Sequence, residues 1–264
     1  MNLQVLISTM HQNDYSLLKK MNINSNAIVI NQTDSKSSTM FKKNNNDILW
    51  VNSFERGLSK SRNLAIKKAD SNICLLADDD LVYCNNYREI VLETFEYNPK
   101  IDIIIFQVEG IEKKFKNYKA KSFKIGYLSS MKVSSVQIAF RLDSIRKKEI
   151  KFNEMFGAGA KFKMGEENIF LINCLKNGLN IKYIPKKIAN LHIGNSSWFD
   201  GFSKEYFISR GASFAGMSKK LSFFLIFQFA IRKYSLYKNS MSLVTAIIYM
   251  LKGRQKYLSW ENNQ

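Results

Sequence analysis

The feature that most constrains the fold is an apolar run that ends in three consecutive carboxylates. Residues 73–77 read Ile-Cys-Leu-Leu-Ala, and Asp78, Asp79 and Asp80 follow directly. An uninterrupted apolar run of this length suits a strand that is covered on both faces, as in a parallel sheet. The three carboxylates then lie at the carboxyl end of a strand, which is where open α/β sheets bind ligands.

This acidic cluster predicts a site for a divalent cation. On an extended backbone alternate side chains share a face, so Asp78 and Asp80 can converge on one ion while Asp79 points elsewhere. Carboxylate oxygens suit Mg²⁺ or Mn²⁺, which keep water and substrate phosphates in their remaining positions. The alternative is a solvated acidic loop, but three adjacent like charges repel one another unless a cation is present.

The order of apolar and amphipathic stretches predicts a doubly wound α/β fold. Strands are expected at residues 3–8, 26–31, 48–51 and 101–108, and helices after Gly57, at 86–98 and after Gly165. The polar stretch 34–46 is expected to be a surface loop. In residues 113–124 lysines alternate with aromatic rings; this pattern suits nucleic-acid binding, but we favour the outward lysines of an edge strand.

Cationic side chains lie near the start of the helix that follows Gly57. They are Arg56, Lys60 and Arg62. The free amides and the dipole of a helix N-terminus already favour an anion, so these side chains could hold a diphosphate. For Lys60 a solvated position on the helix surface explains the residue equally well.

A second group of candidate residues lies between positions 152 and 168. Gly157 and Gly159 indicate a backbone that passes close to a ligand. Glu166 and Glu167 follow Gly165 and occupy the first turn of a helix. Acidic residues in a first turn stabilise the helix dipole whatever else they do, and the same pair also suits a general base, so both interpretations stay open here.

The C-terminal part of the chain is strongly basic. The whole sequence has a net charge of +18, and residues 201–264 carry 10 basic and two acidic side chains. Their apolar runs, 223–231 and 242–251, are shorter than the ~20 residues of a spanning helix. Bordering cations and aromatic rings favour helices that lie in an anionic membrane surface; the alternative is a helical pair packed on the preceding domain or across a homodimer interface. We therefore expect two units, residues 1–200 and 201–264.

The cysteines and the start of the sequence bear on localisation. Cys74, Cys84 and Cys174 show no metal-site spacing and are expected to be reduced. Residues 1–8 show neither a basic segment nor a long apolar core, so no secretory signal is expected. The expected location is the cytoplasm, peripheral on the inner face of the cell membrane.

Three motifs, taken in order, resemble the inverting family 2 glycosyltransferases of the GT-A fold, of the bacterial polysaccharide type. The first is Gly-Leu-Ser at 57–59 with Arg-Asn at 62–63, the second is Leu-Leu-Ala-Asp-Asp-Asp at 75–80, and the third is Phe-Asn-Glu-Met-Phe-Gly at 152–157 followed by Gly-Glu-Glu at 165–167. The resemblance covers residues 3–195. It implies a Rossmann-like mixed sheet flanked by helices.

The resemblance also implies roles for the acidic residues. Asp78 and Asp80 fall on the motif that binds a divalent metal bridging the diphosphate of a nucleotide-sugar, and Asp79 would orient the donor sugar or ribose. Glu167 falls on the catalytic base, with Glu166 beside it as the other candidate. The family more often has Asp at the base position, so Glu167 reaches one methylene further.

Further positions follow from the resemblance. Ser8 and Thr9 match the start of the family's nucleotide-binding region. Asn31 and Gln32 stand where many members have an Asp that contacts the base. His192 lies where some members supply a further metal ligand, and a nitrogen ligand would favour manganese, although a lone His is as often structural.

The activity implied is metal-dependent, inverting transfer of a sugar from a nucleotide-diphosphate donor to a hydroxyl of a glycan or lipid-linked acceptor, in cell-surface polysaccharide synthesis. Two alternatives are a non-catalytic basic protein that binds nucleic acid and a metal-dependent phosphoryl-transfer enzyme. The carboxylates argue against nucleic acid, because they repel phosphates unless a metal is present.

Overall fold

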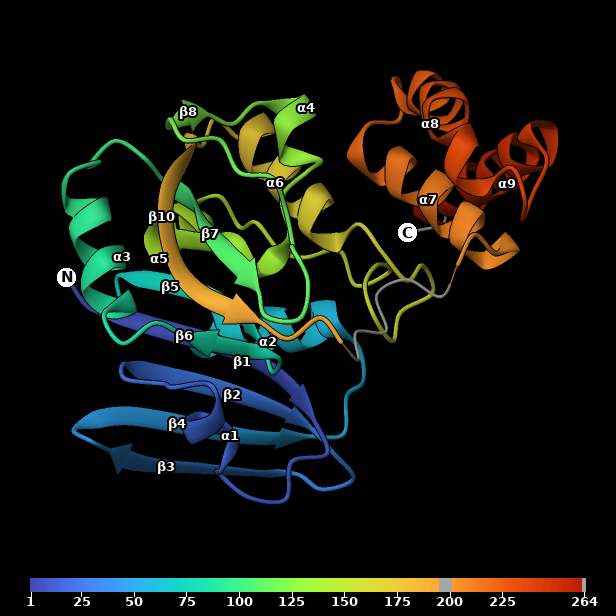
Figure 1. Cartoon of the computed structure of the whole chain (residues 1–264). Helices are drawn as coiled ribbons and strands as arrows, with labels where there is room; N and C mark the ends of the chain where they lie inside the picture. The colour runs from blue at the N-terminus through green and yellow to red at the C-terminus, as the bar shows by residue number, and fades with distance from the viewer. Residues whose placement is uncertain (195–200, 263–264) are drawn as a thin grey trace.

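The structure is a computed structural model that describes residues 1–194 and 201–262. A mixed sheet carries helices on both faces, and three C-terminal helices stand at its side (Figure 1). The strands are β1 (Leu3–Met10), β2 (Asn26–Gln32), β3 (Ser37–Lys43), β4 (Asn46–Ser53), β5 (Ile73–Asp78), β6 (Leu81–Tyr83), β7 (Ile103–Gly110), β8 (Phe123–Lys124), β9 (Ile138–Arg141) and β10 (Ile181–Leu191). The helices are α1 (Leu17–Lys20), α2 (Leu58–Lys68), α3 (Tyr87–Glu96), α4 (Tyr127–Ser130), α5 (Leu142–Lys147), α6 (Glu166–Lys176), α7 (Lys204–Met217), α8 (Ser222–Tyr237) and α9 (Leu243–Glu261).

The strand order is β3-β4-β2-β1-β5-β9-β7-β10-β6, and β8 pairs with β10. Strands β4, β2, β1 and β5 run parallel to one another, whereas β9 is antiparallel to both β5 and β7. Parallel strands need crossover connections, which α1 provides between β1 and β2, α2 between β4 and β5, and the edge strand β3 between β2 and β4. The expected α/β class with a mixed sheet is therefore confirmed.

The two faces of the sheet form two separate cores. On β5, Ile73, Leu75 and Ala77 pack with α1 and α3, while Cys74 and Leu76 pack with α2, α5 and α6. This alternation is the period of two that an extended strand imposes. Every apolar side chain of β5 is buried on one face or the other, and the polar Asp78 is the last residue of the strand.

The polar stretch that we expected to be a surface loop contains an edge strand. β3 pairs antiparallel with β4 from Ser37↔Asn52 to Lys43↔Asn46. Its residues are largely exposed on both faces, so the sequence shows no apolar alternation there. Backbone pairing with β4 makes the strand, and the lysines at its end are typical of a protected edge.

The C-terminal helices have a core of their own. Side chains of α7, α8 and α9 pack with one another and with Phe156, Phe162 and Ile169 of the preceding region. In residues 1–194 and 201–262, no helix is both long and apolar enough to cross a membrane. The expected boundary between residues 200 and 201 adjoins residues 195–200, which lie outside the described residues.

Candidate active site

Two pockets meet at the carboxyl ends of the central strands. The first has a volume of about 600 Å³ and is lined by Ser8, Thr9, Met10, Gln32, Arg56, Gly57, Leu58, Asp78, Asp79, Asp80, Glu112, Ala158, Gly159, His192 and Gly194. The second, of about 290 Å³, lies towards α7 and is lined by Leu58, Asp78, Ser134, Ser135, Ala158, Lys163, Met164, Gly165, Glu166, Glu167, Gly201, Ser203, Glu205, Tyr206 and Ser209. Asp78 lines both pockets, so the acidic cluster lies where they join.

Arg62 ties the two acidic motifs together beneath these pockets. Its guanidinium is buried and donates to Asp78 Oδ1 at 2.8 Å and to Glu166 Oε1 at 3.1 Å. Burial alone would lower the pKa of Arg62, but Asp78 and Glu166 raise it above its usual value. Arg62 is thus a fixed positive charge that connects α2, the end of β5 and the start of α6.

The three aspartates have different surroundings. Asp78 is the last residue of β5 and also accepts a hydrogen bond from Ser135 Oγ at 3.4 Å. Asp79 is exposed and accepts a hydrogen bond from Thr9 Oγ1 at 2.6 Å. Asp79 and Asp80 form a turn, so the extended backbone that we expected to place Asp78 and Asp80 on one face ends at Asp78.

Asp80 has the least compensated carboxylate. Its Oδ1 is buried and has no hydrogen-bond partner among the residues that the structure describes. Burial, together with the charges of Asp78 and Asp79, raises the pKa of Asp80 to about 7. A buried carboxylate oxygen without a donor is costly, and a cation would relieve that cost.

The residues of the first pocket fit a divalent cation that is completed by substrate. Among the described residues, no three His, Cys, Asp or Glu side chains are grouped as a protein-only metal site requires. Mg²⁺ and Mn²⁺ sites commonly use one or two carboxylates and take their other oxygens from water and substrate phosphates. Asp80 supplies an unpartnered oxygen for such a site, and Asp78 lies in the same pocket.

His192 is held next to the acidic cluster by Asp80 and by Glu112, a residue that no sequence motif identifies. The backbone N–H of His192 donates to the carbonyl oxygen of Asp80 at 2.9 Å. Its Nδ1 lies 2.8 Å from Glu112 Oε1, and Glu112 Oε2 accepts from the backbone N–H of Ile193 at 2.7 Å. These hydrogen bonds lower the pKa of Glu112 to about 2. The sequence gives no signal for Glu112, because its contact spans 80 positions.

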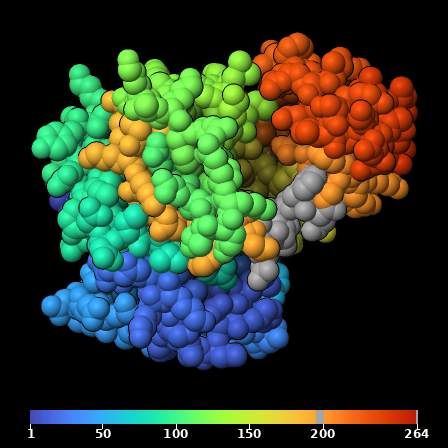
Figure 2. All heavy atoms as spheres, in the orientation of Figure 1, coloured from blue at the N-terminus to red at the C-terminus, as the bar shows by residue number. Residues whose placement is uncertain are grey.

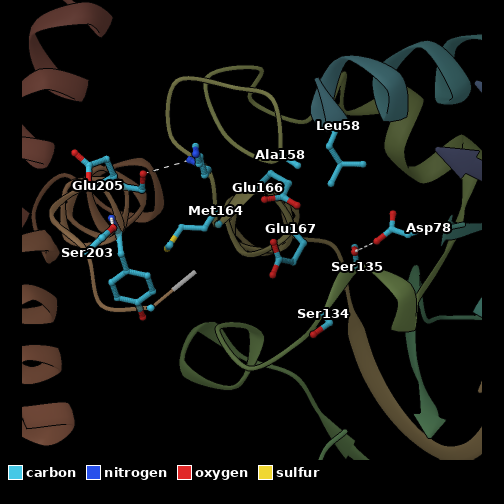
Figure 3. A pocket seen from close by; sticks show the side chains of 15 residues that line it. Leu58, Asp78, Ser134, Ser135, Ala158, Met164, Glu166, Glu167, Ser203 and Glu205 are labelled. Carbon is cyan, nitrogen blue, oxygen red and sulfur yellow. Dashed lines mark hydrogen bonds between the residues drawn. The ribbon is translucent and has the colours of Figure 1, made fainter. Parts of the chain in front are cut away.

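Glu166 and Glu167 begin α6 as expected, but their environments differ. Both line the second pocket, but Glu166 is buried and bound to Arg62, whereas Glu167 is half-buried. Figure 3 shows Glu167 between Ser203 and Glu205 of the α7 region on one side and Asp78, Ser134 and Ser135 on the other. Burial and the neighbouring Glu166 raise the pKa of Glu167. A carboxyl group with a raised pKa in a pocket is suited to proton transfer.

Lys116, from the lysine- and aromatic-rich stretch, also belongs to this region. Its Nζ donates to the carbonyl oxygen of Lys132, to Ser134 Oγ and to Gln137 Oε1, at 2.6–2.8 Å. Burial lowers the pKa of Lys116 to about 8, opposed by the charge of Glu167. Lys116 is half-buried, and the regular alternation of lysines around it hides its different role from the sequence pattern.

Of the remaining predicted nucleotide-binding residues, some line the first pocket and the others do not. Ser8, Thr9 and Gln32 line the first pocket, and Gln32 Oε1 also accepts from the backbone N–H of Gly57 at 2.7 Å. Asn31 is buried and engaged with the backbone of Gln12 and with Asn52. Lys60 lies on α2 and lines neither of the two pockets.

The glycine-rich segment packs against the start of α2. Gly57, the N-cap of α2, and Gly159 have φ values of 121° and 75°, which favour glycine. A Cβ on Gly159 would lie 3.2 Å from the Cα of Gly57, and Leu58 N–H donates to the carbonyl oxygen of Ala158 at 2.9 Å. The expected close backbone approach is therefore between two parts of the chain that jointly line the first pocket.

Comparison with known proteins agrees with this geometry. Residues 15–169 match Glycosyl transferase family 2. No curated protein sequence matches the chain. Among solved structures, Staphylococcus aureus TarS 1–349 in complex with UDP-GlcNAc has a TM-score of 0.67 at 12% identity, over 100% of this chain and 93% of that one. The mannosyltransferase PcManGT from Pyrobaculum calidifontis, in complex with GDP-Man and Mn²⁺, has a TM-score of 0.56 at 11% identity, over 97% and 87% of the two chains.

At these identities the structural likeness shows the fold, which is the GT-A fold expected from the motifs. The sequence match covers more than half of the chain, from the first helix to the start of α6. It includes Gly57 at the N-cap of α2, the acidic cluster, and Glu166 and Glu167. The chain therefore belongs to glycosyl transferase family 2 and is a glycosyltransferase.

Proposed function

We propose that this glycosyltransferase binds a nucleoside-diphosphate sugar in the first pocket and transfers its sugar, with inversion, to an acceptor hydroxyl in the second pocket. The observation that carries the proposal is that the two pockets share Asp78 in their linings, with Glu167 in the second of them. A donor in the first pocket and an acceptor in the second would therefore lie next to each other. The nucleotide-sugars bound by TarS and PcManGT support this choice of donor.

Charge supports a metal-dependent reaction. The first pocket is lined by Asp78, Asp79, Asp80 and Glu112, against the one cationic side chain of Arg56 in its described lining. Such a surface repels a diphosphate, so the donor needs a cation at Asp80, with Asp78 and His192 as further ligand candidates. A bound Mn²⁺ or Mg²⁺ would neutralise charge on the departing nucleoside diphosphate.

Glu167 is the proposed general base. Both glutamates line the second pocket, but Glu166 is already engaged by Arg62, whereas Glu167 carries a raised pKa. The acceptor oxygen forms a bond to the anomeric carbon while its proton passes to Glu167. The bond from that carbon to the diphosphate oxygen breaks, and the leaving group keeps the electron pair. Attack from the face opposite the leaving group inverts the anomeric carbon.

The lining of the second pocket favours a hydroxyl-rich acceptor. Ser134 and Ser135 lie on one side, and Ser203, Glu205 and Tyr206 lie on the α7 side. Hydroxyl and carboxylate groups of this kind can exchange hydrogen bonds with a sugar. We therefore propose a glycan or lipid-linked glycan acceptor, and a role in cell-surface polysaccharide synthesis.

The proposal is tested first by finding the donor. A panel of nucleotide-sugars, including UDP-GlcNAc and GDP-mannose, is screened with Mn²⁺ for protection against thermal unfolding, and the best donor is then used in transfer assays. Glu167→Gln should abolish transfer and retain donor binding. Glu205→Gln, a matched change in the same pocket, should alter mainly the acceptor KM. Full transfer by Glu167→Gln would refute the assignment of the base.

A further inference from the structure

The outer face of α8 is apolar although nothing in the described chain covers it. Phe224, Phe227, Ile231 and Tyr234 follow one another at steps of three and four residues, which places them on one side of the helix. We call these four residues the α8 outer stripe. Phe224 is 66% exposed and Ile231 is 65% exposed. The α8 outer stripe is therefore a continuous exposed apolar surface.

The opposite face of α8 is also apolar. Leu225, Ile226, Ala230 and Tyr237 are buried in the core formed by α7, α8 and α9. The inner face therefore accounts for the packing of α8 within this unit. An exposed apolar patch that is rimmed by polar residues, as the outer stripe is, typically marks a surface that meets a protein or a membrane. Figure 2 shows the C-terminal helices as a lobe beside the α/β part.

The charges around the stripe indicate what that partner is. Lys220 precedes α8 and Lys238 follows it, so they lie beyond the two ends of the stripe, and both are exposed. Arg232 is exposed on the same helix, and the Arg254 guanidinium lies 3.9 Å from the centre of the Phe223 ring, next to the stripe. Long cationic side chains at the border of an apolar helix face can reach lipid headgroups while the rings enter the acyl boundary.

Other partners fit this surface less well. Residues 201–264 carry 10 basic and two acidic side chains, so two copies placed face to face would bring like charges together. Nucleic acid would match the charge, but its phosphates leave four apolar side chains uncovered. An anionic bilayer meets both requirements, because it offers negative headgroups above an apolar layer.

We propose that the α8 outer stripe and its bordering cations dock this protein onto an anionic lipid surface. The surface and the second pocket are connected through α7, which lines the pocket and packs against α8. Docking through α8 therefore holds the acceptor pocket near the membrane surface. The proposal concerns lipid binding alone and does not depend on which sugar is transferred.

The test uses the full chain without substrates, sedimented with vesicles of phosphatidylcholine alone or with about 30% phosphatidylglycerol. The wild type should bind the anionic vesicles at least about tenfold more tightly than the neutral ones, and less tightly in about 0.5 M NaCl. Phe224→Ser with Phe227→Ser should weaken binding to anionic vesicles by about tenfold or more. Met40→Ser with Leu128→Ser, a matched loss of exposed apolar side chains elsewhere, should leave it unchanged.

A second pair of variants tests the charges independently. Lys220→Glu with Lys238→Glu should weaken binding to anionic vesicles, whereas Lys121→Glu with Lys148→Glu, an equal change outside the C-terminal helices, should do so much less. Because the substituted side chains are exposed, each variant should unfold at the wild-type temperature. Equal affinity for neutral and anionic vesicles, or wild-type binding by the Phe224 and Phe227 double variant, would overturn the proposal. So would a wild-type dimer that the same double variant dissociates, because the stripe would then be a homodimer interface.

Discussion

The buried Arg62 Nη2 lies 2.8 Å from Oδ1 of Asp78, a residue that lines both pockets. The same guanidinium holds Glu166 at 3.1 Å. The end of β5 and the first turn of α6 are therefore fixed relative to each other by one buried charge. This arrangement sets the distance between the proposed metal carboxylates and the proposed base on the next residue, Glu167.

Removal of this charge should cost far more than removal of a surface charge. Arg62→Met leaves Asp78 and Glu166 without their partner, and breaking a buried pair of this kind costs about 3–5 kcal/mol. Lys42→Met, which removes an exposed pair with Asp47, should cost about 1 kcal/mol or less. Urea unfolding of both variants measures the difference. Equal losses would show that Arg62 does not hold the site together.

Asp80 should decide the response to a divalent cation. Its pKa is raised, so the folded protein loses stability as the pH rises from the ordinary carboxyl range to about 7 and this carboxyl ionises. Above that pH and without metal, Asp80→Asn should therefore unfold at a higher temperature than the wild type. Mn²⁺ with a nucleoside diphosphate should stabilise the wild type and leave Asp80→Asn nearly unchanged. Asp143→Asn, an equal change of charge at an exposed position outside both pockets, should keep the metal response.

The sequence predicts a strand well where the strand is apolar on both faces or where apolar and polar residues alternate along it. The apolar run at 73–77 and the apolar strand at 101–108 both lie in the centre of the sheet as β5 and β7. β3 could not be found in this way, because its side chains are exposed on both faces and only its backbone pairs with β4. α7 was missed as a separate element, since its buried side chains face other C-terminal helices.

In the candidate site, the roles that depend on sequence motifs could be predicted, and the contacts between distant residues could not. Asp78 and Glu167 stand out by their neighbours in sequence, and both line the pockets. The burial of Arg62 could not be foreseen, because it depends on two carboxylates that lie 16 and 104 positions away. Glu112 carries no local motif at all, and only the fold brings it to His192.

Glu112 should position His192 in the first pocket. A carboxylate that binds one ring nitrogen fixes the orientation of the imidazole, and losing such a partner commonly weakens metal binding by about 10–100-fold. Glu112→Ala and His192→Ala should therefore each weaken Mn²⁺-dependent binding of a nucleoside diphosphate by about tenfold or more. Glu109→Ala breaks an exposed pair with Lys187 nearby and serves as the control. Mn²⁺ titrations followed by calorimetry distinguish these outcomes.

The rate of transfer should increase with pH through the neutral range. A general base works only when ionised, and burial together with Glu166 raises the pKa of Glu167 above that of an ordinary carboxyl group. The charge of Lys116 opposes this shift, so Lys116→Met should move the midpoint of the kcat profile to higher pH. Lys114→Met, at an exposed position two residues away, should leave the midpoint in place. A profile that is flat across neutral pH would argue against Glu167 as the base.

Close contact between α7 and α9 should control both stability and the acceptor pocket. A Cβ on Gly253 would overlap the backbone of Ile208, because the two helices touch without side chains between them. Gly253→Ala must push α7 aside and should cost about 1–3 kcal/mol. Gly126→Ala, where a Cβ meets no atom of the described residues within 4 Å, should have little effect. Since Ser209 follows Ile208 and lines the second pocket, Gly253→Ala should also raise the acceptor KM more than the donor KM, whereas an equal rise in both would place the effect elsewhere.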